Sequence, residues 1–121
     1  MASNWIKVCT VEDIPLLEGR RTKIEGFYVG VFHTEEGFYA IGDVCPHMGG
    51  PLSDGLVART EVSCPLHNRR IALESGEVVN DELSRVLTFP VEVRNGEVYV
   101  DAGVLSKREE SNKRSSEENV A

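Results

Sequence analysis

The chain has 121 residues, 40% of them hydrophobic, and carries a formal net charge of −7 at pH 7. This length suits one domain with a sizeable core, whereas the acidic balance disfavours a nucleic-acid-binding role, because phosphate backbones attract basic proteins. No apolar run approaches the ~18 residues of a membrane span, and residues 1–7 lack the charged and apolar segments of a secretory signal. We therefore expect a cytoplasmic protein with neither nucleic acid nor membrane among its partners.

The first half of the chain alternates apolar and polar residues in short runs, which is typical of strands. A strand over residues 5–9 is followed by a predicted capped helical turn at Thr10–Asp13, since acidic side chains are favoured in a first turn. Turn signals at Glu25-Gly26 and Glu35–Gly37 then separate three further strands, predicted at residues 20–25, 27–33 and 38–41. Consecutive strands with such short connections predict an antiparallel meander.

Two potentially reactive side chains occur in these strands without an evident chemical partner. Cys9 lies in the first predicted strand, and we expect a packed core or edge residue there, because free cysteine usually behaves as a small hydrophobe. His33 ends a strand beside a turn and has no cysteine nearby. We therefore expect His33 to be a solvated or packing histidine rather than a ligand.

The middle of the chain contains two matched Cys/His pairs, Cys45-Pro46-His47 and Cys64-Pro65-Leu66-His67. In each pair one turn can aim a thiolate and an imidazole at the same point, so two such turns together supply four metal ligands. Structural zinc sites more often combine Cys-x(2–4)-Cys with a separate histidine pair, which this spacing fits poorly. The spacing does fit a 2Fe-2S centre in which two histidines replace two cysteines on one iron. A zinc-stabilised binding module without a redox role stays open as an alternative.

The segments Cys45–Leu52 and Cys64–Asn68 resemble the two cluster loops of Rieske proteins. This resemblance implies an all-β fold, an antiparallel β-sandwich or barrel with a small cluster-binding subdomain at one end, at about residues 43–79. It also implies a Rieske-type 2Fe-2S cluster as the cofactor. The thiolates of Cys45 and Cys64 would hold one iron, and the imidazoles of His47 and His67 would hold the iron that changes valence.

In the second half, strands are predicted at residues 56–63, 70–73 and 77–79. Residues 86–93 and 97–101 are expected to pair across Asn95-Gly96, the strongest hairpin signal in the chain, while Pro90 indicates an edge or a bulge.

The folded domain is expected to span residues 1–103, followed by a flexible charged tail over residues 104–121. The tail contains four basic and four acidic residues, so the charge of −7 belongs to residues 1–103. This negative charge suits docking to a basic partner, or it simply keeps the protein soluble.

The loops also indicate where in the Rieske range this protein falls. Rieske proteins of the cytochrome bc complexes carry a further cysteine in each loop and a serine near the second loop, whereas Gly50 and Leu66 stand at the cysteine positions here. Fewer hydrogen-bond donors leave a reduced cluster less stabilised. We therefore expect a low-potential electron carrier that does not oxidise quinols.

Residues 5–102 look most like the small subunit of assimilatory NAD(P)H nitrite reductase, in His47–Leu52 and in Cys64–Glu77. The resemblance implies an electron-transfer subunit, not catalytic alone, for a larger flavin- and siroheme-bearing reductase that converts nitrite to ammonium. Arg69 stands where these subunits often carry tryptophan. The alternative is the Rieske ferredoxin of an aromatic-ring dioxygenase, which usually has a Gly-x-Phe pattern that Asn68–Ile71 lacks. Whether Arg69 and Arg70 dock the partner or lie on a solvated strand stays open.

Overall fold

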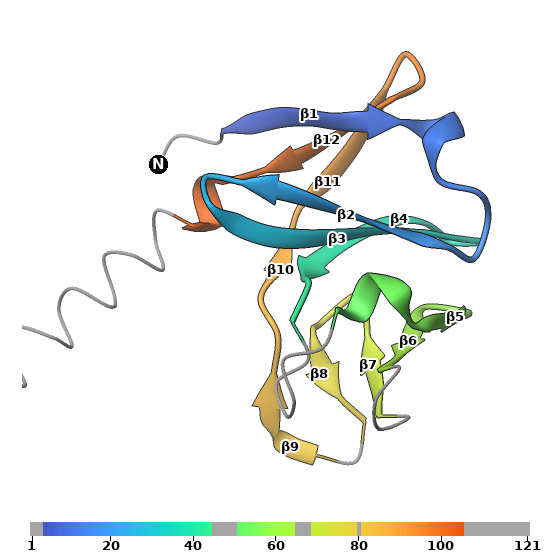
Figure 1. Ribbon diagram of the computed structural model, residues 1–121, viewed down its shortest axis with the longest axis vertical. Coiled ribbons are helices and arrows are strands. Elements are labelled where there is room, and N and C mark those ends of the chain that lie inside the picture. The colour runs from blue at the N-terminus through green and yellow to red at the C-terminus, as the bar shows by residue number, and fades with distance from the viewer. Residues whose placement is uncertain (1–3, 45–50, 65–68, 80, 106–121) are drawn as a thin grey trace, which may run out of the picture.

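The structure, a computed structural model, describes residues 4–44, 51–64, 69–79 and 81–105. Their strands form three antiparallel sheets, two at one end of the molecule and one at the other (Figure 1). The predicted all-β antiparallel architecture is therefore confirmed. Over these same ranges, no helix is long and apolar enough to cross a membrane.

The first sheet has the order β1-β12-β11 and joins the two ends of the described chain. It consists of β1 (Trp5–Thr10), β11 (Val91–Arg94) and β12 (Glu97–Asp101). Asn95 and Gly96 both have positive φ, 51° and 78°, as a two-residue hairpin turn with the twist of its strands requires. The predicted hairpin across Asn95-Gly96 is thus confirmed.

The turn after β1 is the short helix η1 (Val11–Asp13), as predicted. The backbone N–H of Thr10 donates to Asp13 Oδ2 at 2.9 Å. This bond, which favours the charged carboxylate, lowers the pKa of Asp13 from its ordinary value.

The second sheet contains the predicted meander. Its order is β10-β4-β3-β2, formed by β2 (Gly19–Ile24), β3 (Phe27–Thr34), β4 (Gly37–Gly42) and β10 (Thr88–Phe89). The turn at Glu25-Gly26 again has two positive φ angles, 51° and 82°. The register pairs Ile24 with Phe27 across that turn and Thr34 with Gly37 across the next.

The third sheet forms the opposite end of the molecule, below the other two in Figure 1. After the short helix η2 (Leu52–Asp54), it runs in chain order through β5 (Leu56–Ala58), β6 (Glu61–Ser63), β7 (Arg70–Ala72), β8 (Glu77–Val78) and β9 (Asp81–Arg85). It extends past residue 79, where the predicted cluster-binding subdomain ends, because β9, which was not predicted, adds a further strand.

Two of the predicted strands are wrong, because each of them consists of two shorter strands in the structure. Residues 56–63 reverse at Arg59-Thr60, so that β5 and β6 pair with each other, although no Gly, Pro or Asn marks the turn. Residues 86–93 divide at Pro90, where β10 pairs with β4 and β11 pairs with β12. Proline has no N–H to donate to a ladder, and here it marks the point where the chain changes sheet.

Strand β3 separates two hydrophobic cores, because its side chains alternate between its faces. Val29 and Val31 face the core between the first two sheets. Phe32 faces the core between the second and third sheets, together with Ile41 and Leu52. The first core also includes Leu105, which is 5% exposed, so packing continues slightly past the predicted boundary at residue 103. The rest of the predicted tail lies outside the described residues.

Candidate metal centre

Cys64 is the one predicted ligand that the described residues include; Cys45, His47 and His67 lie outside them. It directly follows β6 and is fully buried, with 0% of its surface exposed. Its neighbours in the core between the second and third sheets include Leu52 and Ile71. A buried thiol at a strand end is positioned to bind a metal away from bulk water.

The base of the second predicted loop is fixed by the ladder between β6 and β7. Ser63 pairs with Arg70, and the backbone N–H of Cys64 donates to the Arg69 carbonyl at 2.7 Å. The chain therefore leaves the sheet after Cys64 and returns to it at Arg69. The residues that flank 65–68, Cys64 and Arg69, therefore lie side by side.

The base of the first predicted loop is fixed by the carboxylate of Asp43, which follows β4 and is fully buried. Its Oδ1 accepts from the Ser53 backbone N–H at 2.6 Å, and its Oδ2 accepts from the Ser53 hydroxyl at 2.6 Å. Asp43 precedes the loop and Ser53 follows it. One side chain thus joins both ends of the segment that contains Cys45 and His47.

Arg21, on β2, neutralises this buried carboxylate. Its Nε lies 2.7 Å from Asp43 Oδ2, and its Nη2 donates to the Asp43 carbonyl at 3.0 Å. The guanidinium also lies over the ring of Tyr28, 4.2 Å from its centre, which is within cation–π range. Gly30 leaves room for the carboxylate, because a Cβ there would lie 3.2 Å from Asp43 Oδ1 and 2.9 Å from Phe32.

Gly55 joins the bases of the two loops. A Cβ at this position would lie 2.0 Å from the carbonyl oxygen of Ser63, the residue before Cys64. Only glycine allows the chain leaving the first loop to approach the strand leading into the second so closely. The turns that carry the two Cys/His pairs therefore start from one connected region at one end of the β scaffold.

These contacts were not predicted from the sequence. The available signal was a carboxylate, Asp43, between apolar residues immediately before the first Cys/His pair, since a buried charge requires partners. Nothing local to Arg21, on a strand much earlier in the chain, indicated that it would supply the compensating charge.

The residues present fit a Rieske-type cluster. Two cysteines and two histidines are the donor set of that centre, and the described loop bases bring their two segments to one end of the third sheet. When bound, the cluster supplies reversible one-electron transfer. The four ligands themselves remain a prediction.

Cys9 and His33 both lie outside this region, as expected. Cys9 is half-buried against the core between the first two sheets, and burial raises the pKa of its thiol, with a further contribution from Asp13. The Nδ1 of His33 lies 2.8 Å from the Ile14 carbonyl, and its ring stacks on Phe38 with centres 4.2 Å apart. Packing roles for both residues are confirmed.

Comparison with known proteins gives consistent results. Residues 4–101 match the family of Rieske-like 2Fe-2S domains. The ferredoxin component of naphthalene 1,2-dioxygenase/salicylate 5-hydroxylase systems from Ralstonia sp is 30% identical over 101 residues, which are 83% of this chain and 97% of that protein. The 3-phenylpropionate/cinnamic acid dioxygenase ferredoxin subunit of Photorhabdus laumondii is 34% identical over 99 residues, 77% of this chain and 90% of that protein.

A solved structure assigned provisionally as the small subunit of a nitrite reductase (NADPH) is also similar. It superposes with a TM-score of 0.76 and 28% sequence identity, over 82% of this chain and 99% of that chain. Dioxygenase ferredoxins, found by sequence, and a nitrite reductase small subunit, found by structure, thus share nearly their whole length with this chain.

Proposed function

Because the chain belongs to the family of Rieske-like 2Fe-2S domains, we propose that its cluster is held by Cys45, His47, Cys64 and His67. We further propose that the chain is the small subunit of an NAD(P)H-dependent nitrite reductase and passes single electrons to the larger reductase subunit. The observation that carries the choice of partner is the superposition on a nitrite reductase small subunit over 99% of that chain. The loop sequences from His47 to Leu52 and from Cys64 to Glu77 support the same choice.

A second candidate, the ferredoxin of an aromatic-ring dioxygenase, is favoured by a different observation. The ferredoxins from Ralstonia sp and Photorhabdus laumondii are 30% and 34% identical to this chain. In both candidates the chain carries electrons and a partner holds the substrate, so the chain itself needs no catalytic residues.

The chain's own residues would hold the donor atoms still during transfer. The Asp43 carboxylate closes the first loop at its base, and the ladder from Cys64 to Arg69 closes the second. A ligand set that keeps its geometry in both oxidation states lowers the reorganisation energy of electron transfer.

The test is reconstitution with each class of partner. The purified protein, reduced and added to a siroheme-bearing nitrite reductase large subunit, should raise NAD(P)H-dependent nitrite reduction. A dioxygenase terminal component with its reductase and aromatic substrate forms the parallel assay. Stimulation of the dioxygenase alone would assign the second candidate, and stimulation of neither would contradict both.

A matched pair of cysteine variants controls this experiment. Cys64→Ser should abolish the cluster and the stimulation, because ligand geometry and local folding are coupled, whereas Cys9→Ser should retain both. Purified protein should contain about two irons and two sulfides per chain. A zinc-containing, colourless Cys9→Ser protein would contradict the assigned ligands.

A further inference from the structure

Strands β5, β6 and β7 present an outer face next to Cys64 and Arg69, the residues that flank the second predicted loop. The alternate residues Val57, Val62 and Ile71 point inward and are buried, so the remaining side chains point outward. The ladders arrange these outward side chains in two rows, Leu56-Ser63-Arg70 and Ala58-Glu61-Ala72. Three of the six, Ala58, Ser63 and Ala72, are small, which allows another surface to approach the sheet closely at these positions.

Leu56 is the apolar feature of this face. It is 81% exposed, whereas the next residue of β5, Val57, is buried. Its ladder partner Ser63 is too small to cover it. A single exposed leucine is common on protein surfaces, but this one is paired with Ser63, the residue directly before Cys64.

The segment that forms β5–β7 has the opposite charge to the rest of the chain. Residues 56–72 contain three arginines and one acidic residue, a net charge of +2, while the remainder of the chain carries −9. The three arginines, Arg59, Arg69 and Arg70, all belong to the β5–β7 region and are exposed. An approaching protein surface therefore meets a local field that differs in sign from the net charge.

Arg59 occupies a strained position. Its φ of 56° is unfavourable for a side chain with a Cβ, and glycine is the usual residue at such a turn. Within the described part of the chain its guanidinium has no hydrogen bond or ion pair. Strain without a stabilising contact is most often retained where a residue serves function.

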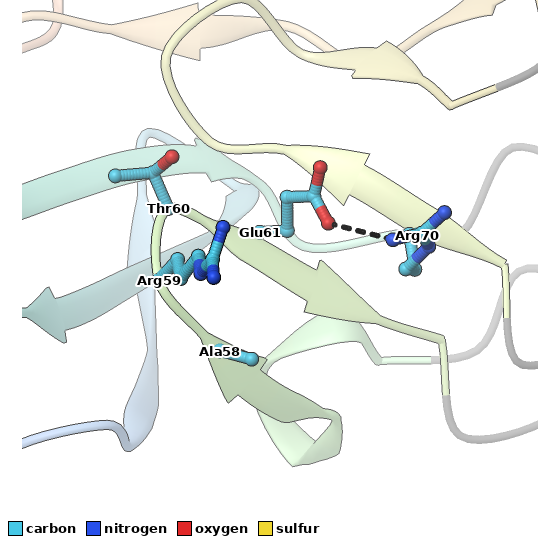
Figure 2. Close-up of a pocket in the computed structure, with 5 residues that line it drawn as sticks. All are labelled: Ala58, Arg59, Thr60, Glu61 and Arg70. Carbon is cyan, nitrogen blue, oxygen red and sulfur yellow. Dashed lines mark hydrogen bonds and ion pairs between the residues drawn. The ribbon is translucent and has the colours of Figure 1, made fainter.

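Arg59 and Arg70 line one hollow of about 450 Å³, together with Ala58, Thr60 and Glu61 (Figure 2). Arg70 Nη1 lies 3.3 Å from Glu61 Oε1, and both side chains are substantially exposed. Exposed ion pairs are worth little, so Arg70 can exchange Glu61 for a carboxylate of a partner. The hollow then offers two guanidinium groups to an incoming acidic side chain.

This face lies within reach of an electron-transfer contact. Ser63 and Arg70 adjoin the two ends of residues 64–69, and Glu61 is about 10 Å along the strand from Cys64. A standard protein interface covers ~800 Å² on each partner. An interface that includes the end of the second loop would therefore also cover the outer face of β5–β7.

We propose that the outer face of β5–β7 docks an acidic surface of the larger redox partner, with Leu56 as the apolar anchor and Arg59 and Arg70 as the basic rim. The inference rests on the proposed function, which supplies the need for a partner. The sequence had suggested a basic partner from the net charge alone; the local charge at this face favours an acidic one.

The first test needs no biological partner. The reduced protein is oxidised by ferricyanide, a trivalent anion, or by hexaammineruthenium(III), a trivalent cation, and the second-order rates are compared. Arg59→Glu/Arg70→Glu should slow ferricyanide about threefold or more per reversed charge at moderate salt and accelerate the cation. Arg94→Glu, an exposed arginine on β11, changes the net charge by the same amount per site and should alter both rates far less.

The second test uses the siroheme subunit and the dioxygenase terminal component as acceptors. With whichever accepts electrons, Arg59→Glu/Arg70→Glu and Leu56→Ser should each raise the concentration for half-maximal transfer about tenfold and leave the maximal rate unchanged. Leu16→Ser, which removes another half-exposed leucine, is the matched control. The wild-type rate should fall with ionic strength, as for complementary charges.

The two proposals fail differently. If neither partner accepts electrons but the ferricyanide rates shift as expected, the partner assignment is wrong and the charge pattern at this face is upheld. If a partner accepts electrons from the variants and the wild type equally well, or if Arg94→Glu has the same effects as the β5–β7 variants, the docking face is overturned.

Discussion

The buried carboxylate of Asp43 can be tested by the isosteric change Asp43→Asn. The native carboxylate accepts three hydrogen bonds, from the Ser53 N–H, the Ser53 hydroxyl and Arg21 Nε, at 2.6, 2.6 and 2.7 Å. An asparagine has one oxygen and one NH2 group. Whichever way the amide is turned, its NH2 group faces either the Ser53 N–H or the Arg21 Nε–H, so one donor is left without an acceptor.

The expected loss follows from these contacts. Hydrogen bonds to a charged group contribute ~1.5–3 kcal/mol each, and a buried donor left unpaired costs a further ~1–3 kcal/mol. The side chain of Arg21 is 37% exposed, so water recovers part of the loss on that side. We expect Asp43→Asn to lower the free energy of unfolding by about 3 kcal/mol, a large share of the ~5–15 kcal/mol of a typical domain.

Urea denaturation of the holoprotein under argon, followed by circular dichroism and by visible absorbance, measures the effect. With a slope of ~1–3 kcal/mol/M, the midpoint should fall by about 1–3 M, and the visible absorbance should be lost at lower urea because the first loop loosens. Ser53→Ala should cost ~1.5 kcal/mol, the lower end of the range for one hydrogen bond to a charged group, because the backbone N–H of residue 53 still donates to the carboxylate. The exposed neighbour Asp54 is the control, and Asp54→Asn should change stability by less than ~0.5 kcal/mol. Equal midpoints for Asp43→Asn and Asp54→Asn would refute the reasoning.

Three further predictions concern single residues. Gly96→Ala places an alanine at a positive φ without a clash, so it should lower the free energy of unfolding by ~1–2 kcal/mol and keep the cluster. Gly55→Ala should reduce the iron content, because its Cβ would lie 2.0 Å from the carbonyl oxygen of Ser63. Equal iron content in both variants would contradict the close approach at Gly55. The pKa of Asp13 is lowered in the folded state, so its contribution to stability is present near neutral pH and lost as pH falls through that lowered pKa. Asp13→Asn should therefore flatten the acid side of the thermal-denaturation profile, and an unchanged profile would speak against it. Burial raises the pKa of Cys9, so iodoacetamide should alkylate it in the holoprotein more slowly than free cysteine at pH 8; comparable rates, followed by mass spectrometry, would exclude this.

The chemistry of this protein was determined by local sequence. Two Cys/His pairs in short turns indicate a cluster without knowledge of any distant contact, because each turn is a few residues long. The family assignment and the Rieske-type 2Fe-2S cofactor are confirmed by the match over residues 4–101, and the zinc alternative is not supported. The meander and the Asn95-Gly96 hairpin were equally local, since two-residue turns depend on their own φ angles.

The two predicted strands that are wrong lie where the pairing between strands, and not the local alternation of apolar and polar residues, decides where a strand ends. Residues 56–63 form a continuous strand-like run, and only the ladder between β5 and β6 reveals the reversal at Arg59, a residue that gives no turn signal. Pro90 was recognised as an irregularity, but the change of sheet that it marks depends on where β4 lies.

Tertiary structure alone decided how the site is supported and which face surrounds it. Arg21 reaches Asp43 across 22 positions of sequence, and a long-range ion pair leaves no periodic trace in the chain. The outer face of β5–β7 likewise depends on register, which places Leu56, Ser63 and Arg70 in one row. The sequence specifies the ligand turns through short-range geometry, whereas buried charge compensation and surface composition emerge only when distant strands are brought together.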